Sequence, residues 1–217
     1  MTKQMDQNRA RTIAHMLLQI NAVTLRPNHP FTWTSGIKSP IYCDNRLTMA
    51  YPQVRDFIAE GFVDLIHREW GQVDVVAGTA TAGIPHAAFV SQKMFLPMAY
   101  IRSSAKGHGK ENLIEGRIRA GQRVVVIEDL VSTGGSSVKA AQAVQEIGGI
   151  VAGVAAIFTY GFEKAAKTFA EAGIPLRTLT SYEVLLQVAL ANGSISETEV
   201  ELLASWRKDP EHWEPTA

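Results

Sequence analysis

The sequence has little cysteine, no net charge and no long apolar run. Its 217 residues contain one cysteine, Cys43, which excludes an internal disulfide framework and is typical of a reducing compartment. Basic and acidic residues number 21 each, so overall charge gives no reason to expect binding to nucleic acid or to a membrane surface. No segment approaches roughly 18 consecutive apolar residues, and residues 1–20 lack the apolar run and cleavage site of a signal peptide. We therefore expect a soluble, cytoplasmic protein with no nucleic-acid partner and no membrane segment.

What the sequence does contain is an alternation of short β-branched runs with helical periodicity. The expected strands cover residues 73–77, 98–101, 123–127, 151–159 and 176–180, with further short strands joined by turns within 28–48. The expected helices cover residues 7–20, 52–70, 86–94, a stretch that passes through 144 and 147, 163–172 and 181–206. The polar, glycine-bearing stretch 107–116 has no apolar period and is expected to be a loop.

This order of elements predicts an α/β fold. Strand–loop–helix repetition places parallel strands in one sheet with helices on both faces. Residues 124–127 are apolar throughout, as in a strand that is buried on both faces. Residues 1–217 contain no linker or internal repeat, so we expect a single domain. Its core should lie at about residues 51–180, beside a small accessory subdomain built from residues 1–50 and 181–217.

Residues 124–137, VVVIEDLVSTGGSS, carry the strongest chemical signal. A buried strand leads to two adjacent carboxylates, Glu128 and Asp129, and then to a small glycine- and hydroxyl-bearing loop before a helix. Glycines let the backbone approach an anion closely, and N–H groups at a helix N-terminus bind phosphate. Carboxylates at the carboxyl end of a parallel strand are well placed to hold ribose hydroxyls or to organise Mg²⁺. A plain glycine-rich turn would explain the loop but not the paired acids, so the residues favour a sugar-phosphate site.

This segment resembles the signature with which type I phosphoribosyltransferases bind PRPP (5-phosphoribosyl 1-diphosphate). The resemblance implies the type I phosphoribosyltransferase fold, a mainly parallel central sheet flanked by helices, in which the accessory subdomain forms a hood. It implies that Glu128 and Asp129 grip the ribose hydroxyls and that Asp129 is catalytic, with Mg²⁺ held through PRPP and no direct protein ligand. The loop implied to bind PRPP consists of Leu130, Val131, Ser132, Thr133, Gly134, Gly135 and Ser136.

Residues 31–48, FTWTSGIKSPIYCDNRLT, resemble the hood segment of bacterial orotate phosphoribosyltransferases. The resemblance implies contacts with orotate from Lys38, together with Ser132 of the phosphate loop. Some members have a lysine where Thr34 stands, which leaves open how the orotate carboxylate is neutralised. A proline-rich edge hairpin would explain Pro40 but not a lysine among aromatic residues.

Residues 78–87, GTATAGIPHA, resemble the family's loop on the pyrophosphate side, where a non-proline cis peptide is common. Small residues before Gly83 suit close backbone approach to an anion. Composition alone fits an ordinary strand-to-helix turn equally well. Some relatives have a lysine where Ala82 stands, so a cationic contact from that position is missing.

Residues 100–116, YIRSSAKGHGKENLIEG, resemble the family's mobile catalytic lid. The resemblance implies that Arg102, Lys106 and His108 bind PRPP and act in catalysis; without it, the stretch would be interpreted as a solvated surface loop. Cations on a closing lid stabilise the charge that builds on departing pyrophosphate, and they exclude water. Other members often have a second lysine where Ser103 stands.

Together these resemblances, which extend through the tail SWRKDPEHW typical of a Gram-positive-like branch, imply one activity. The ribose 5-phosphate group of PRPP would pass to orotate, giving orotidine 5′-monophosphate and pyrophosphate in de novo pyrimidine biosynthesis. The implied enzyme depends on Mg²⁺ and is a homodimer with its lid acting in trans.

Two alternatives stay open. A PRPP-sensing transcription regulator would need a basic RNA-binding face or a separate DNA-binding domain, and for the latter residues 1–50 are too few and too weakly basic. A purine or xanthine phosphoribosyltransferase would need a hood unlike residues 31–48.

Overall fold

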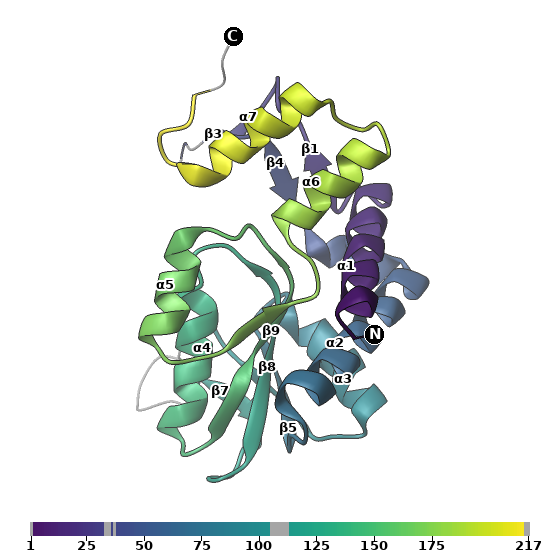
Figure 1. Ribbon diagram of the computed structural model, residues 1–217. Coiled ribbons are helices and arrows are strands. Elements are labelled where there is room, and N and C mark those ends of the chain that lie inside the picture. Colours follow the sequence, from purple (N-terminus) through teal and green to yellow (C-terminus); the bar gives the residue numbers. More distant parts are fainter. Residues whose placement is uncertain (1, 33–35, 37, 105–112, 215–217) are drawn as a thin grey trace.

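A six-stranded sheet in the order β10-β9-β8-β5-β6-β7 forms the centre of the molecule (Figure 1). The computed structural model describes residues 2–32, 36, 38–104 and 113–214. The strands are β5 (Val75–Thr79), β6 (Met98–Ile101), β7 (Ile114–Gly116), β8 (Arg123–Val131), β9 (Ile150–Thr159) and β10 (Leu176–Thr178). Neighbouring strands run parallel except β7, which pairs antiparallel with β6. The predicted mainly parallel α/β sheet is confirmed.

Helices cover both faces of the sheet (Figure 1). They are α2 (Pro52–Trp70) and α3 (Gly83–Met94) on one face, with α4 (Gly135–Glu146) and α5 (Glu163–Glu171) on the other. Val125 and Ile127 of β8 belong to the core shared with α2 and α3, whereas Val124 and Val126 belong to the core shared with α4 and α5. Successive side chains of a strand point to opposite faces, so a strand covered on both sides must be apolar at every position. That requirement explains the VVVI run.

Segments from the N-terminal and C-terminal parts of the chain pack together, with α1 (Thr2–Gln19) beside α2 and α6 (Tyr182–Ala191), and α6 and α7 (Glu197–Lys208) beyond one end of the sheet (Figure 1). Their other elements are β1 (Val23–Leu25), β2 (Phe31–Thr32), β3 (Lys38–Ser39), β4 (Ile41–Cys43) and the 3₁₀-helix η1 (Asn45–Ala50). The fully buried Trp206 of α7 packs against Tyr160, Phe162 and Tyr182, and its indole N–H donates to the Lys38 carbonyl at 3.2 Å. The C-terminal helix is thus fixed to the N-terminal strands.

Local capping explains where several of these helices begin. Pro52 occupies the first turn of α2, where its missing N–H costs no hydrogen bond. Ser196 and Glu199 form a reciprocal capping box at the start of α7. Among the described residues, no helix is both long and apolar enough to cross a membrane.

Several predicted elements differ from the structure in extent: the helical stretch expected at 181–206 is two helices, α6 and α7, and two further differences bear on the site. The expected loop 107–116 contains β7 at its end, where Glu115 pairs with Tyr100 through the backbone, and residues 107–112 lie outside the described residues. The strand expected at 123–127 continues to Val131, since Glu128 and Leu130 still pair with β9. The acidic pair therefore lies within the last four residues of β8 and not after the strand.

Candidate functional site

A pocket of about 280 Å³ lies at the carboxyl ends of three neighbouring strands, beside the start of α4. The carboxyl edge of a parallel sheet is where α/β proteins bind ligands, because loops diverge there and helix N-termini converge. Its lining comes from β5 and the following loop, from β6, from β8 and from α4. Those residues are Thr79, Ala80, Thr81, Ala82, Ile101, Arg102, Ser103, Leu113, Glu128, Asp129, Leu130, Ser136, Lys139 and Ala140.

Glu128 is the buried member of the acidic pair, with 7% of its surface exposed. Its Oε2 accepts a hydrogen bond from the Ser137 hydroxyl at 2.9 Å, and its Oε1 accepts one from the Asp129 N–H at 3.1 Å. Burial raises the pKa of the Glu128 carboxyl to about 7; the adjacent Asp129 charge adds to this, while hydroxyl groups of Thr79 and Ser137 act against it. Glu128 therefore anchors the first turn of α4 to the end of β8.

Asp129 is half-buried and has a different environment. Burial raises the pKa of its carboxyl, and interaction with the Glu128 side chain is the largest effect that opposes this rise, followed by backbone N–H groups and the Arg46 charge. Its backbone carbonyl accepts a hydrogen bond from the Asn45 side chain at 2.7 Å. Of the two acids, Asp129 is the less buried, so its carboxylate is the more accessible to a ligand.

The loop between β8 and α4 has the form expected of a phosphate site. Gly134 is the residue before α4 and has φ 85°, a left-handed conformation that favours glycine. A Cβ at Gly134 would come within 2.9 Å of the Phe169 ring of α5, so packing also requires glycine there. No side chain caps α4 among the described residues, which leaves the first N–H groups of the helix to bind an anion.

The loop after β5 approaches the same pocket. The Ala80–Thr81 peptide is cis, as the family resemblance implied for this segment. Gly83, the first residue of α3, lies so close to β8 that a Cβ would fall within 2.4 Å of the Ile127 carbonyl oxygen. This packing holds Thr79 to Ala82 beside the acidic pair.

Two described cations line the pocket. Arg102, predicted from the lid, makes an ion pair with Glu115 at 3.7 Å, and its backbone N–H donates to the Leu113 carbonyl at 2.7 Å. Lys139 projects from α4, one turn after Ser136, and is exposed. An anion with several charges that occupied the pocket would meet both groups.

Other predicted residues lie elsewhere or outside the described part. Lys38 makes an ion pair with Glu214 at 2.6 Å and does not line the pocket, and neither does Ser132. Lys106, His108 and Thr34 lie outside the described residues, so their roles stay predictions.

Sequence reasoning did not assign Lys139 or Asn45 to this site, and it included Ser137 in the hydroxyl-bearing segment without its bond to Glu128. Ser137 and Lys139 fall on the first turns of α4, and helical spacing from Ser136 would have placed Lys139 on the same side. Asn45 comes from a segment 84 residues away in the chain, and no local pattern indicated its contact with Asp129.

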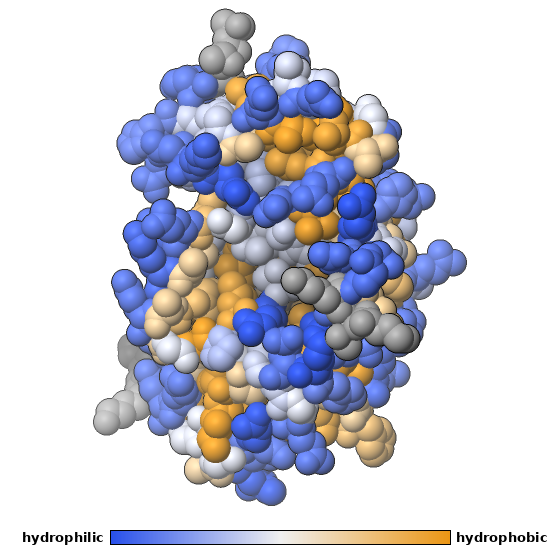
Figure 2. Space-filling view, viewed as in Figure 1, coloured by the Kyte–Doolittle hydropathy of each residue, from blue (hydrophilic) through white to orange (hydrophobic). Residues whose placement is uncertain are grey.

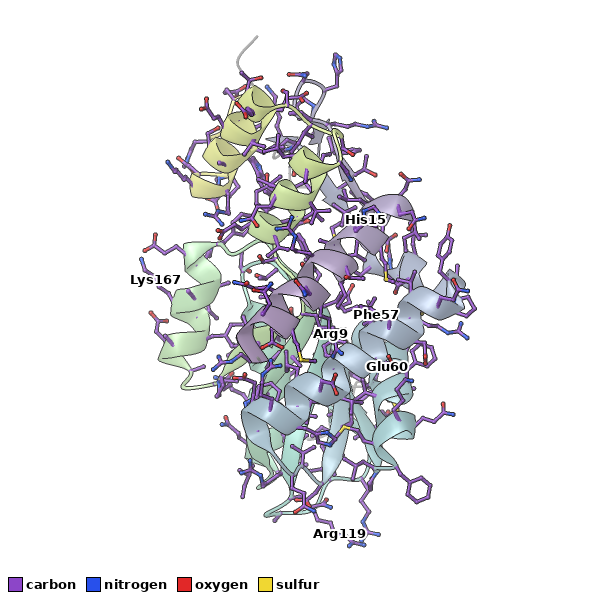
Figure 3. The ribbon with its side chains drawn as sticks, turned by 45° about the vertical axis from the view of Figure 1, so that its right-hand side comes forward. Arg9, His15, Phe57, Glu60, Arg119 and Lys167 are labelled. Carbon is purple, nitrogen blue, oxygen red and sulfur yellow. The ribbon has the colours of Figure 1, made fainter. Side chains whose placement is uncertain are left out.

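Two other hollows lack this chemistry. A larger one, of about 700 Å³, lies between α1, α2 and α6, but two of its three arginines are in ion pairs: Arg9, labelled in Figure 3, with Asp64, and Arg68 with Asp6. Another, of about 290 Å³, is mainly apolar and lies over α6 and α7, where Figure 2 shows an orange surface. Volume alone would select the wrong hollow, and the convergence of carboxylates, hydroxyls and a free helix N-terminus identifies the site.

Comparison of sequences relates this chain to known proteins. The model of the phosphoribosyl transferase domain matches residues 53–190. An orotate phosphoribosyltransferase of Listeria monocytogenes serotype 4b is 58% identical over 203 residues, which are 94% of this chain and 97% of the relative. The chain belongs to the orotate phosphoribosyltransferase family. Another family member, from Halalkalibacterium halodurans, is 60% identical over 92% of this chain and 95% of its own length.

Solved structures of the orotate phosphoribosyltransferase family share the fold. The enzyme of Aeropyrum pernix superimposes with a TM-score of 0.73 at 26% identity, over 85% of this chain and 99% of its own. That of Mycobacterium tuberculosis, solved in complex with PRPP, has a TM-score of 0.64 at 26% identity, over 83% of this chain and 98% of its own. The predicted type I phosphoribosyltransferase fold is confirmed.

Proposed function

We propose that this protein transfers the ribose 5-phosphate group from PRPP to orotate, forming orotidine 5′-monophosphate and pyrophosphate in pyrimidine biosynthesis. The observation that carries this proposal is the pocket in which the acidic pair, the uncapped start of α4 and two cations meet. Membership of the orotate phosphoribosyltransferase family supplies the substrates.

Three groups in the pocket suit the three parts of PRPP. The first N–H groups of α4, after Gly134, are suited to the 5′-phosphate. The carboxylates of Glu128 and Asp129 are suited to the ribose hydroxyls, since ionised carboxylates accept hydrogen bonds. Arg102 and Lys139 are left for the pyrophosphate group.

Transfer breaks the bond between C1 of the ribose and the pyrophosphate oxygen, and forms a bond from C1 to a ring nitrogen of orotate. Positive charge develops on the ribose and negative charge on the leaving group. Asp129 stabilises the former, and Arg102 with the predicted lid residues Lys106 and His108 stabilises the latter. These contacts strengthen as the charges grow, so they act on the rate more than on substrate binding.

The carboxylate oxygens in the pocket suit a magnesium ion that arrives with PRPP. Among the described residues there is no group of three His, Cys, Asp or Glu side chains that could hold a metal ion, but Glu128 and Asp129 offer carboxylate oxygens in the pocket. Mg²⁺ is commonly held by substrate phosphates and water with one or two carboxylates nearby. When bound, it would neutralise part of the phosphate charge that otherwise repels an anionic base.

We further propose a homodimer in the cytoplasm, in which the lid of one subunit covers the site of its partner. Family resemblance supports the dimer, and two-fold dimers are the commonest assembly of soluble proteins. The half-buried free thiol of Cys43 suits a reducing compartment.

Stoichiometry tests the proposed reaction. With PRPP and Mg²⁺, the protein should consume orotate and release pyrophosphate in equal amounts, and chelation of Mg²⁺ should stop both. Release of pyrophosphate without loss of orotate would show that the protein hydrolyses PRPP, and would contradict the proposal.

A further inference from the structure

Asn45 connects the N-terminal segment directly to the acidic pair. It is the first residue of η1, only 1% of its surface is exposed, and its Nδ2 donates to the backbone carbonyl of Asp129 at 2.7 Å. Asn45 itself does not line the pocket. Its contact is with the backbone of a residue that does.

The position of this contact follows from the way the sheet opens. β5 pairs with β8 as far as Gly78 opposite Ile127, and the Thr79 hydroxyl then donates to the Ile127 carbonyl at 3.2 Å. With the two-residue period of a strand, the next carbonyl on that edge belongs to Asp129. There β5 has turned away to form the pocket, and a buried carbonyl requires another donor. The Asn45 amide supplies it.

The Asn45 side chain is itself held in place. The Thr48 hydroxyl, on a fully buried side chain, donates to the backbone carbonyl of Asn45 at 2.6 Å and so holds its main chain. The Cys43 thiol donates to the Asn45 Oδ1 at 3.4 Å, and Asp44 caps η1 by accepting from the Arg46 N–H. A fixed amide can orient the peptide that it binds.

We propose that Asn45 is a positioning residue for the reaction: by fixing the peptide between Asp129 and Leu130, it sets the direction of the Asp129 carboxylate toward the ribose. The carbonyl of Asp129 and the N–H of Leu130 belong to one planar unit, so holding the carbonyl also holds the N–H. The Asp129 side chain is attached next to this unit, so fixing the unit limits the directions that the carboxylate can take. This inference rests on the proposed function, because it assigns Asp129 to the ribose of PRPP.

Two substitutions and a matched control separate positioning from stability. Asn45→Leu removes the donor, and Asn45→Asp keeps the shape while exchanging the donor for an acceptor. Thr180→Val is the control, since Thr180 is also buried and donates to a distant backbone carbonyl, that of Ala10 at 2.9 Å, but does not line the pocket.

All three variants should lose thermal stability to a similar degree, as expected when a buried hydrogen bond is removed. Only the Asn45 variants should lose kcat, by roughly tenfold or more, because a small misplacement of a reacting group has that effect. The loss in kcat should exceed the change in KM for PRPP. Thr180→Val should keep kcat within about twofold of the wild type.

A double-substitution cycle with Asp129→Asn distinguishes a positioning role of Asn45 from a purely structural one, because it measures whether the two losses of activity are additive. If Asn45 acts through the Asp129 carboxylate, Asn45→Leu should reduce the remaining activity of Asp129→Asn little further. Variants are compared after circular dichroism shows a native fold, and Asn45→Asp keeps the comparison possible if Asn45→Leu unfolds.

Unchanged kcat in both Asn45 variants, or an additive loss in the cycle, would overturn the inference. Failure of the wild-type protein to use orotate and PRPP would instead overturn the proposed function. The two failures are therefore distinguishable.

Discussion

At the scale of single residues, the two neighbouring acids of β8 have different surroundings. Glu128 is buried and bound by the Ser137 hydroxyl, so its side chain holds α4 to the strand. Asp129 is half-buried and lines the pocket, with its own backbone held by Asn45. We infer that Asp129 is the main contact with the ribose.

Asp129→Asn should keep the fold, because the change is isosteric, and should lower turnover by orders of magnitude at saturating PRPP. The loss arises because a neutral amide stabilises developing positive charge far less than a carboxylate. Asp74→Asn is a matched control: Asp74 accepts from the Arg123 N–H at 2.7 Å at the opposite end of the same strands. Steady-state kinetics should show normal kcat for the control. A wild-type rate for Asp129→Asn would remove the role given to it.

His86 of α3 should make stability depend on pH. It is 1% exposed, its Nε2 has no hydrogen-bond partner within the described part of the chain, and burial lowers its pKa to about 4. Because the unfolded chain binds the proton first, the stability that the neutral imidazole contributes is present above pH 6.5 and is lost as pH falls toward 4. Between pH 7 and pH 5 the loss should be about 2 kcal/mol.

Denaturant unfolding of wild type and His86→Gln measures this loss, since glutamine does not titrate. The stability difference between them should change with pH by that amount. His212→Gln is the control: His212 is exposed, and the Asp209 carboxylate raises its pKa, so its removal should not reduce the loss at acid pH. Equal acid sensitivity of wild type and His86→Gln would exclude His86 as the cause.

At the scale of elements, the close approach of α3 to β8 sets the shape of the pocket. Gly83 leaves no room for a side chain, since a Cβ would meet the Ile127 carbonyl oxygen and, within 2.5 Å, the Thr79 hydroxyl. Gly83→Ala should therefore lower the melting temperature by several degrees or more, as overpacking against backbone is costly. Gly135→Ala is the control, because a Cβ there meets nothing within 4 Å. Equal melting temperatures for both variants would contradict this packing.

Elements with strong local patterns could be predicted from the sequence. The helix at 52–70 and the strand at 98–101 match α2 and β6 in full, because apolar spacing and Pro52 act locally. β7 could not be predicted, since its three residues depend on backbone pairing with β6 and not on their own side chains. The continuation of β8 through Glu128 was missed because charged residues rarely lie within a buried strand, and here Ser137 satisfies the carboxylate.

The residues of the site, too, could be predicted where local sequence places them and not where distant segments meet. Glu128, Asp129 and Ser136 could be predicted to lie together because a strand, a turn and a helix start follow one another in sequence. Asn45 could not, because its contact spans 84 residues and arises from where the sheet opens. The contact of Lys38 with Glu214 likewise depends on how the C-terminal segment lies over β3.

At the scale of the whole molecule, the proposed dimer makes a specific prediction about complementation. If the lid acts in trans, Lys106 and Asp129 at one site come from different chains. Mixing inactive Lys106→Ala and Asp129→Asn dimers, with subunit exchange, should then restore activity. Half of the dimers would be mixed and each would have one intact site, so recovery should approach about a quarter of wild type.

Light scattering and exchange of labelled subunits provide the controls for this mixture. If the lid acts within its own chain, every site carries a lesion. Verified exchange without recovered activity would therefore rule out the trans arrangement and leave the rest of the site unchanged.

The central claim is that this protein uses orotate as its base, and a comparison of bases tests it most directly. Orotate, uracil, xanthine and adenine are each incubated with the protein, PRPP and Mg²⁺, and loss of the base is measured under identical conditions. The account predicts that orotate alone is consumed at an enzymatic rate, because the chain belongs to a family whose members are named for that base. Consumption of xanthine or adenine at an equal or faster rate would contradict it.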